Sequence, residues 1–520
     1  MEEQNKPNFR GGEDERYCGA YRIFSEDRSQ ERSEDFILPD YLPDVKKIAA
    51  VFPETAIKGR FLGSGTLEYD GETRCRVLYI AEDGTLRSTV FVSGFEDKVG
   101  SGELSEDCVE ILTPVMRGLN VRLINPRKFN IRVQTGAVVE VYKRKCTMPE
   151  LYGAVTRDDE DRLAAKVREF PSLNLTTLCE NGLSLSEDLS FDAATPTAEE
   201  LLFSRVTMQA EDCRLGAGEA QIRGVAQIVC ICAAPTDAQG RRELVKISKD
   251  LTFTQTLKNK ALHADGICDV LLTPENCEFR LREDEFGQKR LIEADVSYKC
   301  CLTVASPKTQ RAVTDAFSLE KEVENDAGEM RFLQPVGALK GSFSVNETVD
   351  LDLPEDGGYF LEYCFCRPEL AVTEEGGRAV LTGNCALSLL LRDSAGDLDA
   401  RRASLPLRFV TDLRSGAGAE GRVTCRASNG RFRLDKNKLT CDFEVPFFGG
   451  AFCPDDLTVL ESIRIQPTKR TLPGSRGSIL LYYPDDGEEA FEIAKKYGVA
   501  PEAVERQVET AARPVLIERK

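Results

Sequence analysis

The sequence predicts a mainly β protein in which tandem β-sandwich-like repeat domains are followed by a small β-α-α-β domain. Three observations predict this fold class. A pattern of short strands and glycine-containing turns recurs along the chain, the length of 520 residues suits three or four domains, and a helical periodicity appears near the C-terminus. Charged residues make up 30% and apolar residues 41%, which is typical of a folded globular chain.

Three stretches of the chain resemble one another. They end at Gly84, Gly240 and Gly396, which lie 156 residues apart in both intervals. Each stretch reads as a strand, a polar turn, a second strand and a turn with glycine, and a further strand follows it. Many short strands with turn signals predict a β-sandwich or a β-barrel for each copy, and the pattern leaves that choice open.

A second landmark relates the first two copies. An acidic segment begins at Ser33 and again at Ser186, and each segment leads to a proline, Pro43 or Pro196, with the same offset of 153 residues. We expect a short amphipathic helix after each proline, because proline suits the first turn of a helix. The apolar spacing of residues 158–170 predicts another helix between the first two copies.

These landmarks divide the chain into five parts. Proline, glycine, serine and basic residues at 468–478 are typical of a linker before the last part. The predicted parts are an N-terminal extension at 1–32, repeats at 33–170 and 171–325, a divergent third repeat at 326–470, and a terminal domain at 473–520.

The terminal domain shows the order strand, helix, helix, strand. Residues 479–483 read as a strand, and residues 488–497 as a helix with apolar side chains on one face. Gly498 suits the position that ends this helix, and Pro501 suits the start of a second one. Residues 514–517 form the predicted closing strand.

The segment from Gly487 to Gly498 resembles the core motif of LysM domains, which bind N-acetylglucosamine polymers. The resemblance implies that Phe491, Ile493 and Tyr497 build the core of this small domain. It also implies a ligand-binding face on the first helix.

That face departs from the LysM pattern. It would comprise Gly487, Glu488, Glu489 and Glu492, and the two adjacent glutamates replace the Asp-Thr pair that usually rims the sugar groove. Acidic side chains crowd and charge such a rim. We therefore expect weakened binding to the sugar polymer and favour a protein ligand.

Charge and composition exclude several classes of partner. The net charge of −19 disfavours nucleic acid and anionic lipid. No apolar run reaches the roughly 18 residues of a membrane span, and the charged N-terminal segment shows no signal peptide.

Because the 18 cysteines are scattered over a long chain without an export signal, we expect reduced thiols.

Neither a catalytic nor a metal site can be assembled from sequence motifs. His263 is the only histidine, so a histidine-dependent triad would have to use it, and a site with several histidines is impossible. Cys230/Cys232 and Cys364/Cys366 could each offer two thiolates on one strand face, but their apolar neighbours favour core packing. We expect no enzymatic activity, no bound metal and no cofactor.

The layout of the whole chain resembles the SipL-like, SpoVID-related family of spore-envelope morphogenesis proteins. The most specific segments are residues 38–44, 77–84 and 125–128 of the first copy, together with the terminal LysM-like domain. The resemblance implies a non-enzymatic scaffold for spore coat assembly in the mother-cell cytoplasm at the forespore surface. It implies a coat morphogenetic ATPase of the SpoIVA kind as the partner of the LysM-like domain. The alternative is a peptidoglycan-binding protein that acts through the same domain.

Overall fold

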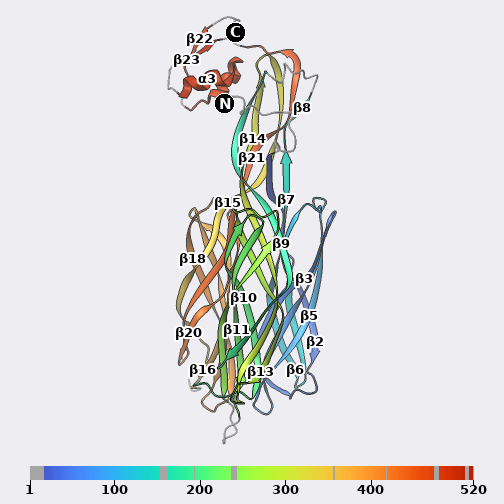
Figure 1. Cartoon of the computed structure of the whole chain (residues 1–520), viewed down its shortest axis with the longest axis vertical. Coiled ribbons are helices and arrows are strands. Elements are labelled where there is room, and N and C mark those ends of the chain that lie inside the picture. The colour runs from blue at the N-terminus through green and yellow to red at the C-terminus, as the bar shows by residue number, and fades with distance from the viewer. Residues whose placement is uncertain are drawn as a thin grey trace.

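The computed structural model is mainly β, and its two described helices lie at one end of a tall β body (Figure 1). The structure describes residues 17–152, 162–192, 194–235, 243–354, 358–416, 418–472, 479–485, 487–509 and 514–518. The strands of the body fall into three units that follow one another along the chain.

The first unit contains two antiparallel sheets. In one sheet β7 is central, with β1 and β2 on one side and β6 on the other; its strands are β1 (Tyr17–Asp27), β2 (Gln30–Ile37), β6 (Val109–Asn125) and β7 (Lys128–Thr147). The second sheet is a meander of β3 (Val45–Gly63), β4 (Thr66–Ala81) and β5 (Leu86–Gly100). Side chains of both sheets, such as Val77 and Phe129, share one buried cluster, so the two sheets face each other.

The second unit repeats this plan. Its first sheet has the order β13-β14-β9, with β9 (Leu163–Ser190), β13 (Ile267–Glu283) and β14 (Lys289–Ser318). Its meander consists of β10 (Glu200–Gly216), β11 (Glu219–Ala233) and β12 (Leu244–Lys258). Ile228, Cys230 and Cys232 of the meander pack against Ile292 and Tyr298 of the first sheet. Core packing of the first Cys-x-Cys pair is thereby confirmed.

The third unit has the same two sheets with a divided edge strand. Its first sheet is built on β15 (Lys321–Asp350) and β21 (Lys438–Lys469), with β19 (Glu420–Cys425), β20 (Ser428–Asp435) and β8 (Glu150–Tyr152) paired to β21. Its meander is β16 (Phe360–Glu375), β17 (Arg378–Arg392) and β18 (Leu398–Arg414). Because β8 belongs to the segment that follows the first unit, the first and third units also share a sheet.

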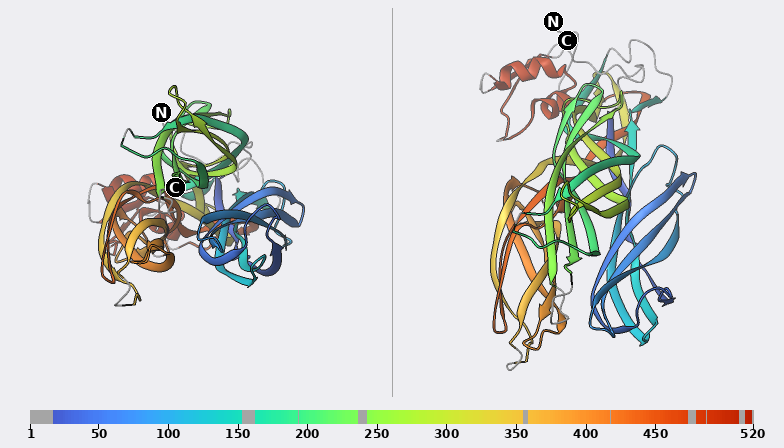
Figure 2. Two further views of the ribbon diagram at one scale, coloured as in Figure 1. Left: turned by 90° about the horizontal axis from the view of Figure 1, so that it is seen from below. Right: turned by 60° about the horizontal axis from the view of Figure 1, so that its bottom comes forward.

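The three units are arranged around a common axis, as the end-on view in Figure 2 shows. On this axis Phe52 of β3, Phe203 of β10 and Phe365 of β16 contact one another, with ring centroids 4.4 to 5.3 Å apart. Burial of three large aromatic side chains at one point gives the units a common core.

A second contact between units lies nearer the helical end of the body. Here the long strands β1, β9, β14, β15 and β21 enclose a buried cluster that includes Tyr17, Phe170, Phe332 and Val459. Ser172 of β9 donates a hydrogen bond to the carbonyl of Cys18, at 2.8 Å. The three units are therefore held together at two levels.

The C-terminal segment contains β22 (Ile479–Tyr482), α2 (Ala490–Tyr497), α3 (Pro501–Glu509) and β23 (Val515–Glu518), in that order, with β22 and β23 antiparallel. We call this segment the terminal module. Phe491, Ile493, Ala494 and Val504 are buried at its centre. No helix in the described part of the chain is both long and apolar enough to span a bilayer.

The helices expected after Pro43 and Pro196 are wrong, because strands β3 and β10 occupy these positions. Both strands carry β-bulges near their start, between Val45 and Lys47 in β3 and between Leu201 and Phe203 in β10. A bulge inserts one extra residue and breaks the alternation of the strand. The resulting apolar spacing imitates that of a helix.

The helix expected at residues 158–170 is also wrong in its described part. Residues 158–161 lie outside the described residues, and β9 starts at Leu163. Leu163 and Phe170 are buried in different clusters. Positions seven residues apart share one face of a helix but lie on opposite faces of a strand, and here both faces are buried.

The expectation of reduced thiols is wrong for four cysteines. Disulfides join Cys18 to Cys146 and Cys179 to Cys301, and each pair lies directly opposite across two antiparallel strands. Sequence spacing gave no sign of these pairs, because the partners are 128 and 122 residues apart.

The predicted division into domains remains a prediction, but its boundaries at 33, 171 and 326 fall inside strands. These strands are β2, β9 and β15, respectively. In the first unit, β1 and most of the 17–32 region pair with β7, so this part of the predicted N-terminal extension belongs to the first sheet.

Candidate functional site

The terminal module packs against the end of the second unit through its first helix. The ring of Phe491 in α2 meets the ring of Phe317 in β14 edge-on, with centroids 5.2 Å apart. Ala164 and Leu319 extend the same apolar contact. Phe491 is therefore shared between the module's own core and the body.

Charged groups surround this apolar contact. Lys166 of β9 forms an ion pair with Glu489 and lies 3.6 Å from the carboxylate of Glu492. The hydrogen bond to Glu489 raises the pKa of Lys166 above its ordinary value. Lys495 of α2 pairs with Asp315 of β14. Two of the residues predicted to bind a partner are thus engaged by the chain itself.

The chain that leads into the module fixes the other end of α2. Arg470 donates a hydrogen bond to the carbonyl oxygen of Lys495, at 2.6 Å. Gly498 ends the helix in the left-handed conformation, with φ +64°. A Cβ at this position would lie 2.5 Å from Leu472, so a larger residue would meet both strain and a clash.

The remaining residues of the predicted face lie apart from this contact. Tyr482 of β22 donates a hydrogen bond to the Glu488 carboxylate, which also accepts one from the backbone of Asp485. Gly487 has φ +88°, in the left-handed region. The structure therefore divides the predicted face: Glu489 and Glu492 face the body, whereas Glu488 is hydrogen-bonded to Tyr482 within the module.

The ribbon formed by β22 and β23, together with Tyr483 directly after β22, exposes large apolar side chains. Ile479, Leu481 and Tyr483 are each 63 to 68% exposed, and Leu516 is 39% exposed. Leu481 and Leu516 are directly opposite in the ribbon. We call these four side chains the ribbon patch.

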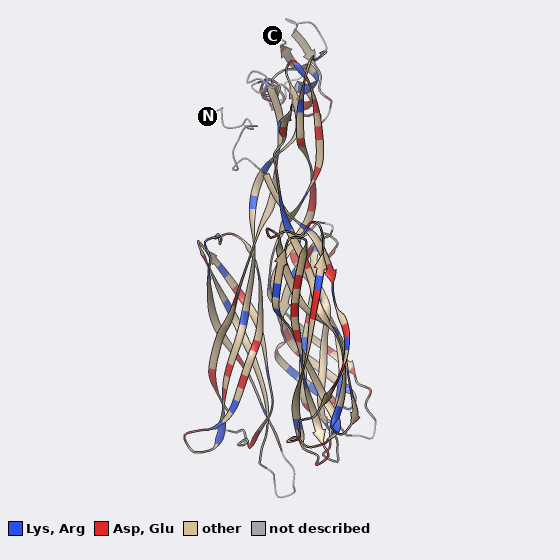
Figure 3. Ribbon diagram, turned by 90° about the vertical axis from the view of Figure 1, so that its right-hand side faces the viewer, with Lys and Arg blue, Asp and Glu red and all other residues tan. Residues whose placement is uncertain are grey.

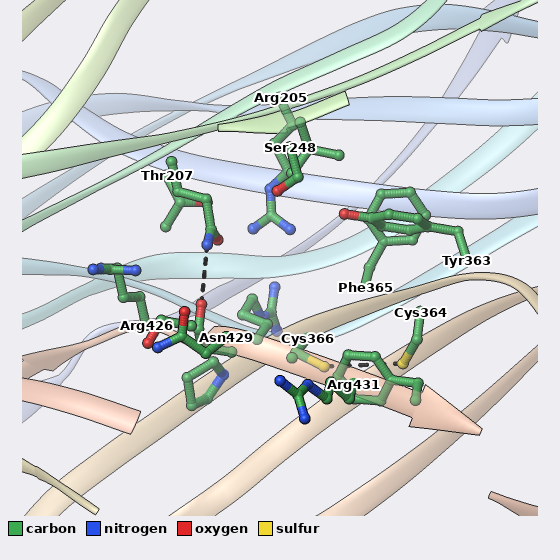
Figure 4. Close-up of a pocket in the computed structure, with 18 of the residues that line it drawn as sticks. Arg205, Thr207, Ser248, Tyr363, Cys364, Phe365, Cys366, Arg426, Asn429 and Arg431 are labelled. Atoms are coloured by element: carbon green, nitrogen blue, oxygen red, sulfur yellow. Dashed lines mark hydrogen bonds between the residues drawn. The ribbon is translucent and has the colours of Figure 1, made fainter. Parts of the chain in front are cut away.

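A second candidate site lies where the three units meet. Three cavities of about 810, 330 and 360 Å³ open between the units, and Arg205 of β10 lines all of them. The largest lies between the meander of the second unit and residues of β16, β19 and β20 (Figure 4). We call the region around Arg205 the axial site.

Equivalent strands bring three charged residues to the axial site. Glu54, Arg205 and Arg367 each follow the axial phenylalanine of their strand by two residues. The Nε atom of Arg205 lies 3.6 Å from a carboxylate oxygen of Glu54. Arg367 lies 3.2 Å from Glu369 of its own strand. Burial lowers the pKa of Arg205, and the nearby Arg367 adds to this effect.

Thiols line one wall of the largest cavity. The sulfur atoms of Cys364 and Cys366 are 3.9 Å apart (Figure 4), and burial raises the pKa of nearby Cys425 to about 12. Protonated thiols are poor nucleophiles and poor metal ligands. Within the described ranges, no group of three or more His, Cys, Asp or Glu side chains is arranged to hold a metal ion.

Charges elsewhere on the body are mixed. In the view of Figure 3, basic and acidic residues alternate along the strands instead of gathering into one large field. Several of them form pairs between neighbouring strands, such as Lys128 with Asp35 and Lys98 with Glu68. The axial site differs from this surface because its two arginines point between units.

Sequence reasoning missed the axial site. The signal was available: aligning the three repeats on Phe52, Phe203 and Phe365 places a charged residue two positions after each.

Comparisons of the chain with protein-family models, with curated proteins and with solved structures found no match.

Proposed function

We propose that this protein is a non-enzymatic scaffold in spore coat assembly. It consists of three tandem β-sandwich-like repeats of the SipL type and a terminal LysM-like domain. It acts in the mother-cell cytoplasm at the forespore surface, where the LysM-like domain binds a coat morphogenetic ATPase of the SpoIVA kind.

The observation that carries this proposal is the ribbon patch. Ile479, Leu481 and Tyr483 project from the terminal module with most of their surface exposed. Neighbouring apolar and aromatic side chains of this kind are typical of the core of a protein–protein interface. Their position at the far end of a long β body suits a tether that presents the module to a partner at a surface.

The acidic helix face supports a protein ligand over a sugar polymer. Glu489 is paired with Lys166, and Glu488 accepts a hydrogen bond from Tyr482. Both carboxylates occupy positions where a sugar groove requires small polar groups at its rim. Linked contacts from the module and the repeats would add avidity at a crowded surface.

Fluorescent fusions in sporulating cells test the proposal. The full chain should form a ring around the forespore, and a chain ending at Thr471 should stay diffuse. Leu481→Glu should behave like the truncation because it places a charge in the ribbon patch. Phe286→Glu, which changes an 86% exposed aromatic side chain between β13 and β14, should keep the ring.

Two binding measurements distinguish the partner classes. The purified chain should bind the SpoIVA-like ATPase, and Leu481→Glu should weaken this binding at least tenfold. The chain should not sediment with insoluble peptidoglycan. Sedimentation with the wall polymer, together with no affinity for the ATPase, would contradict the proposal and favour the peptidoglycan-binding alternative.

A further inference from the structure

The axial site combines three packed phenylalanine rings with charged side chains. In a strand, residues two apart share one face, so Glu54, Arg205 and Arg367 lie on the same side of their strands as the axial phenylalanines. The rings of Phe52, Phe203 and Phe365 contact one another on the axis and form an apolar plug. The charged residues therefore lie next to this plug, where the spaces between the units converge.

Two guanidinium groups meet here, and each has one carboxylate nearby: Glu54 lies beside Arg205, and Glu369, which is 65% exposed, lies 3.2 Å from Arg367. The Nε atoms of Arg205 and Arg367 are buried and have no hydrogen-bond partner among the residues that the structure describes. The side chain of Arg205 is only 15% exposed, whereas that of Glu54 is 43% exposed. Buried donors without acceptors are rare in folded proteins, because they lose hydration without compensation.

Other acids of the largest cavity are already engaged. Asp250 pairs with Arg426 at 2.8 Å, and Glu362 pairs with Arg392 at 2.9 Å. Neither carboxylate is therefore left to balance Arg205 and Arg367. Neutral hydrogen-bonding side chains also line this cavity (Figure 4), namely Thr207, Ser248 and Asn429.

We infer that the axial site binds a small oxyanion between the guanidinium groups of Arg205 and Arg367. Planar guanidinium groups match the geometry of phosphate and carboxylate oxygens, and two of them can hold one anion from two sides. The cavity of about 810 Å³ has room for a phosphate or a small dicarboxylate. This inference is independent of the function proposed for the terminal module.

The position of Glu54 provides a second prediction, of opposite sign to that for the arginines. Its carboxylate is the nearest anion to Arg205 and so competes with any bound anion. Removal of the arginine charges must weaken anion binding, whereas removal of the Glu54 charge must strengthen it. Changes of opposite sign at three equivalent positions would not arise from a general loss of folding.

Thermal unfolding of the full chain provides the test. Inorganic phosphate and succinate are titrated separately, with chloride keeping the ionic strength constant. The midpoint temperature of the wild type should rise and saturate with at least one of the two anions. Saturation by phosphate alone identifies the ligand as phosphate, and saturation by succinate alone identifies a carboxylate; either result supports the site.

Four variants complete the test. Arg205→Gln and Arg367→Gln should each raise the apparent Kd roughly tenfold or more, as expected for loss of a charge-assisted hydrogen bond. Glu54→Gln should lower it. Arg214→Gln, on the same strand as Arg205 but 76% exposed, should leave it unchanged.

Measurements in chloride alone separate binding from folding. Arg205→Gln should unfold at the wild-type temperature or above, because it removes a buried and poorly compensated charge. Glu54→Gln should unfold at a lower temperature, because Arg205 then loses its nearest carboxylate. The inference is overturned if neither anion gives a saturable shift, or if Arg205→Gln and Arg367→Gln retain the wild-type Kd.

Discussion

Replacement of Phe203 by alanine should weaken all three units of the body at once. The side chain is 1% exposed, and its ring contacts Phe52 at 4.7 Å and Phe365 at 5.3 Å. Truncation of a buried phenylalanine to alanine costs about 3–5 kcal/mol of the free energy of unfolding. Each lost aromatic pair adds about 0.5–1.5 kcal/mol.

The upper part of this range applies here because the cavity cannot easily collapse. The neighbouring rings belong to strands of two other units, and each ring is fixed within its own sheet. We expect a loss of about 5 kcal/mol. The double variant Phe203→Ala/Phe365→Ala should lose less than the sum of the two single variants, since both break the same contact.

Urea denaturation followed by circular dichroism measures this loss. Phe286→Ala is the matched control, because the same change at an 86% exposed ring should alter the free energy of unfolding by less than about 0.5 kcal/mol. A loss below about 1 kcal/mol for Phe203→Ala would refute a common core on the axis. Fully additive losses in the double variant would contradict a direct contact between the two rings.

Two further predictions concern the terminal module and the buried thiols. Gly498→Ala should increase hydrogen exchange in α2 and destabilise the module by about 2 kcal/mol, because the new side chain meets left-handed strain and a close contact with Leu472. The control is Gly84→Ala, which has φ +78° but open space around it and should cost only about 1 kcal/mol in its own unit. Burial raises the pKa of Cys75 to about 11, so the folded chain keeps a proton that the unfolded chain loses near pH 9. The free energy of unfolding should therefore fall as the pH rises from 9 towards 11, by about 1.4 kcal/mol per unit from this thiol, and urea denaturation should show a smaller fall in Cys75→Val.

The repeated β pattern was predictable because it depends on local signals. Gly84 and Gly396, which define the repeat spacing, both adopt a left-handed backbone in turns between paired strands. Such turns leave a mark in the sequence, because only glycine adopts this conformation without cost. The mainly β fold class followed from these marks.

The errors came from strands that are buried on both sides. β3 contributes to two different clusters, through Phe52 on one side and Val51 on the other. A strand of this kind carries no clean alternation of apolar and polar residues, and its bulges shift the apolar positions further. Contacts between distant strands, such as the disulfide of Cys18 with Cys146, leave no local mark at all.

The terminal module shows the limit of reasoning from a motif. The pattern around Phe491 predicted a core residue, and this residue is buried, but its ring also contacts Phe317 in the second unit. Likewise, Glu489 could be named as part of a face but not as the partner of Lys166, which lies more than 300 residues earlier in the chain. A motif defines the module's own fold and leaves its docking to the rest of the chain.

Divergence between the repeats explains how charged residues can share the axial site. A strictly repeated sequence would place three identical residues on the axis, and three arginines or three glutamates at that point would repel one another. The chain instead has Glu54, Arg205 and Arg367 at the equivalent positions. Glu54 moderates the repulsion between the two guanidinium groups, and Glu369 pairs with Arg367 from its own strand. The Nε donors of both arginines still have no acceptor among the described residues, and this is the place that we propose for one anion.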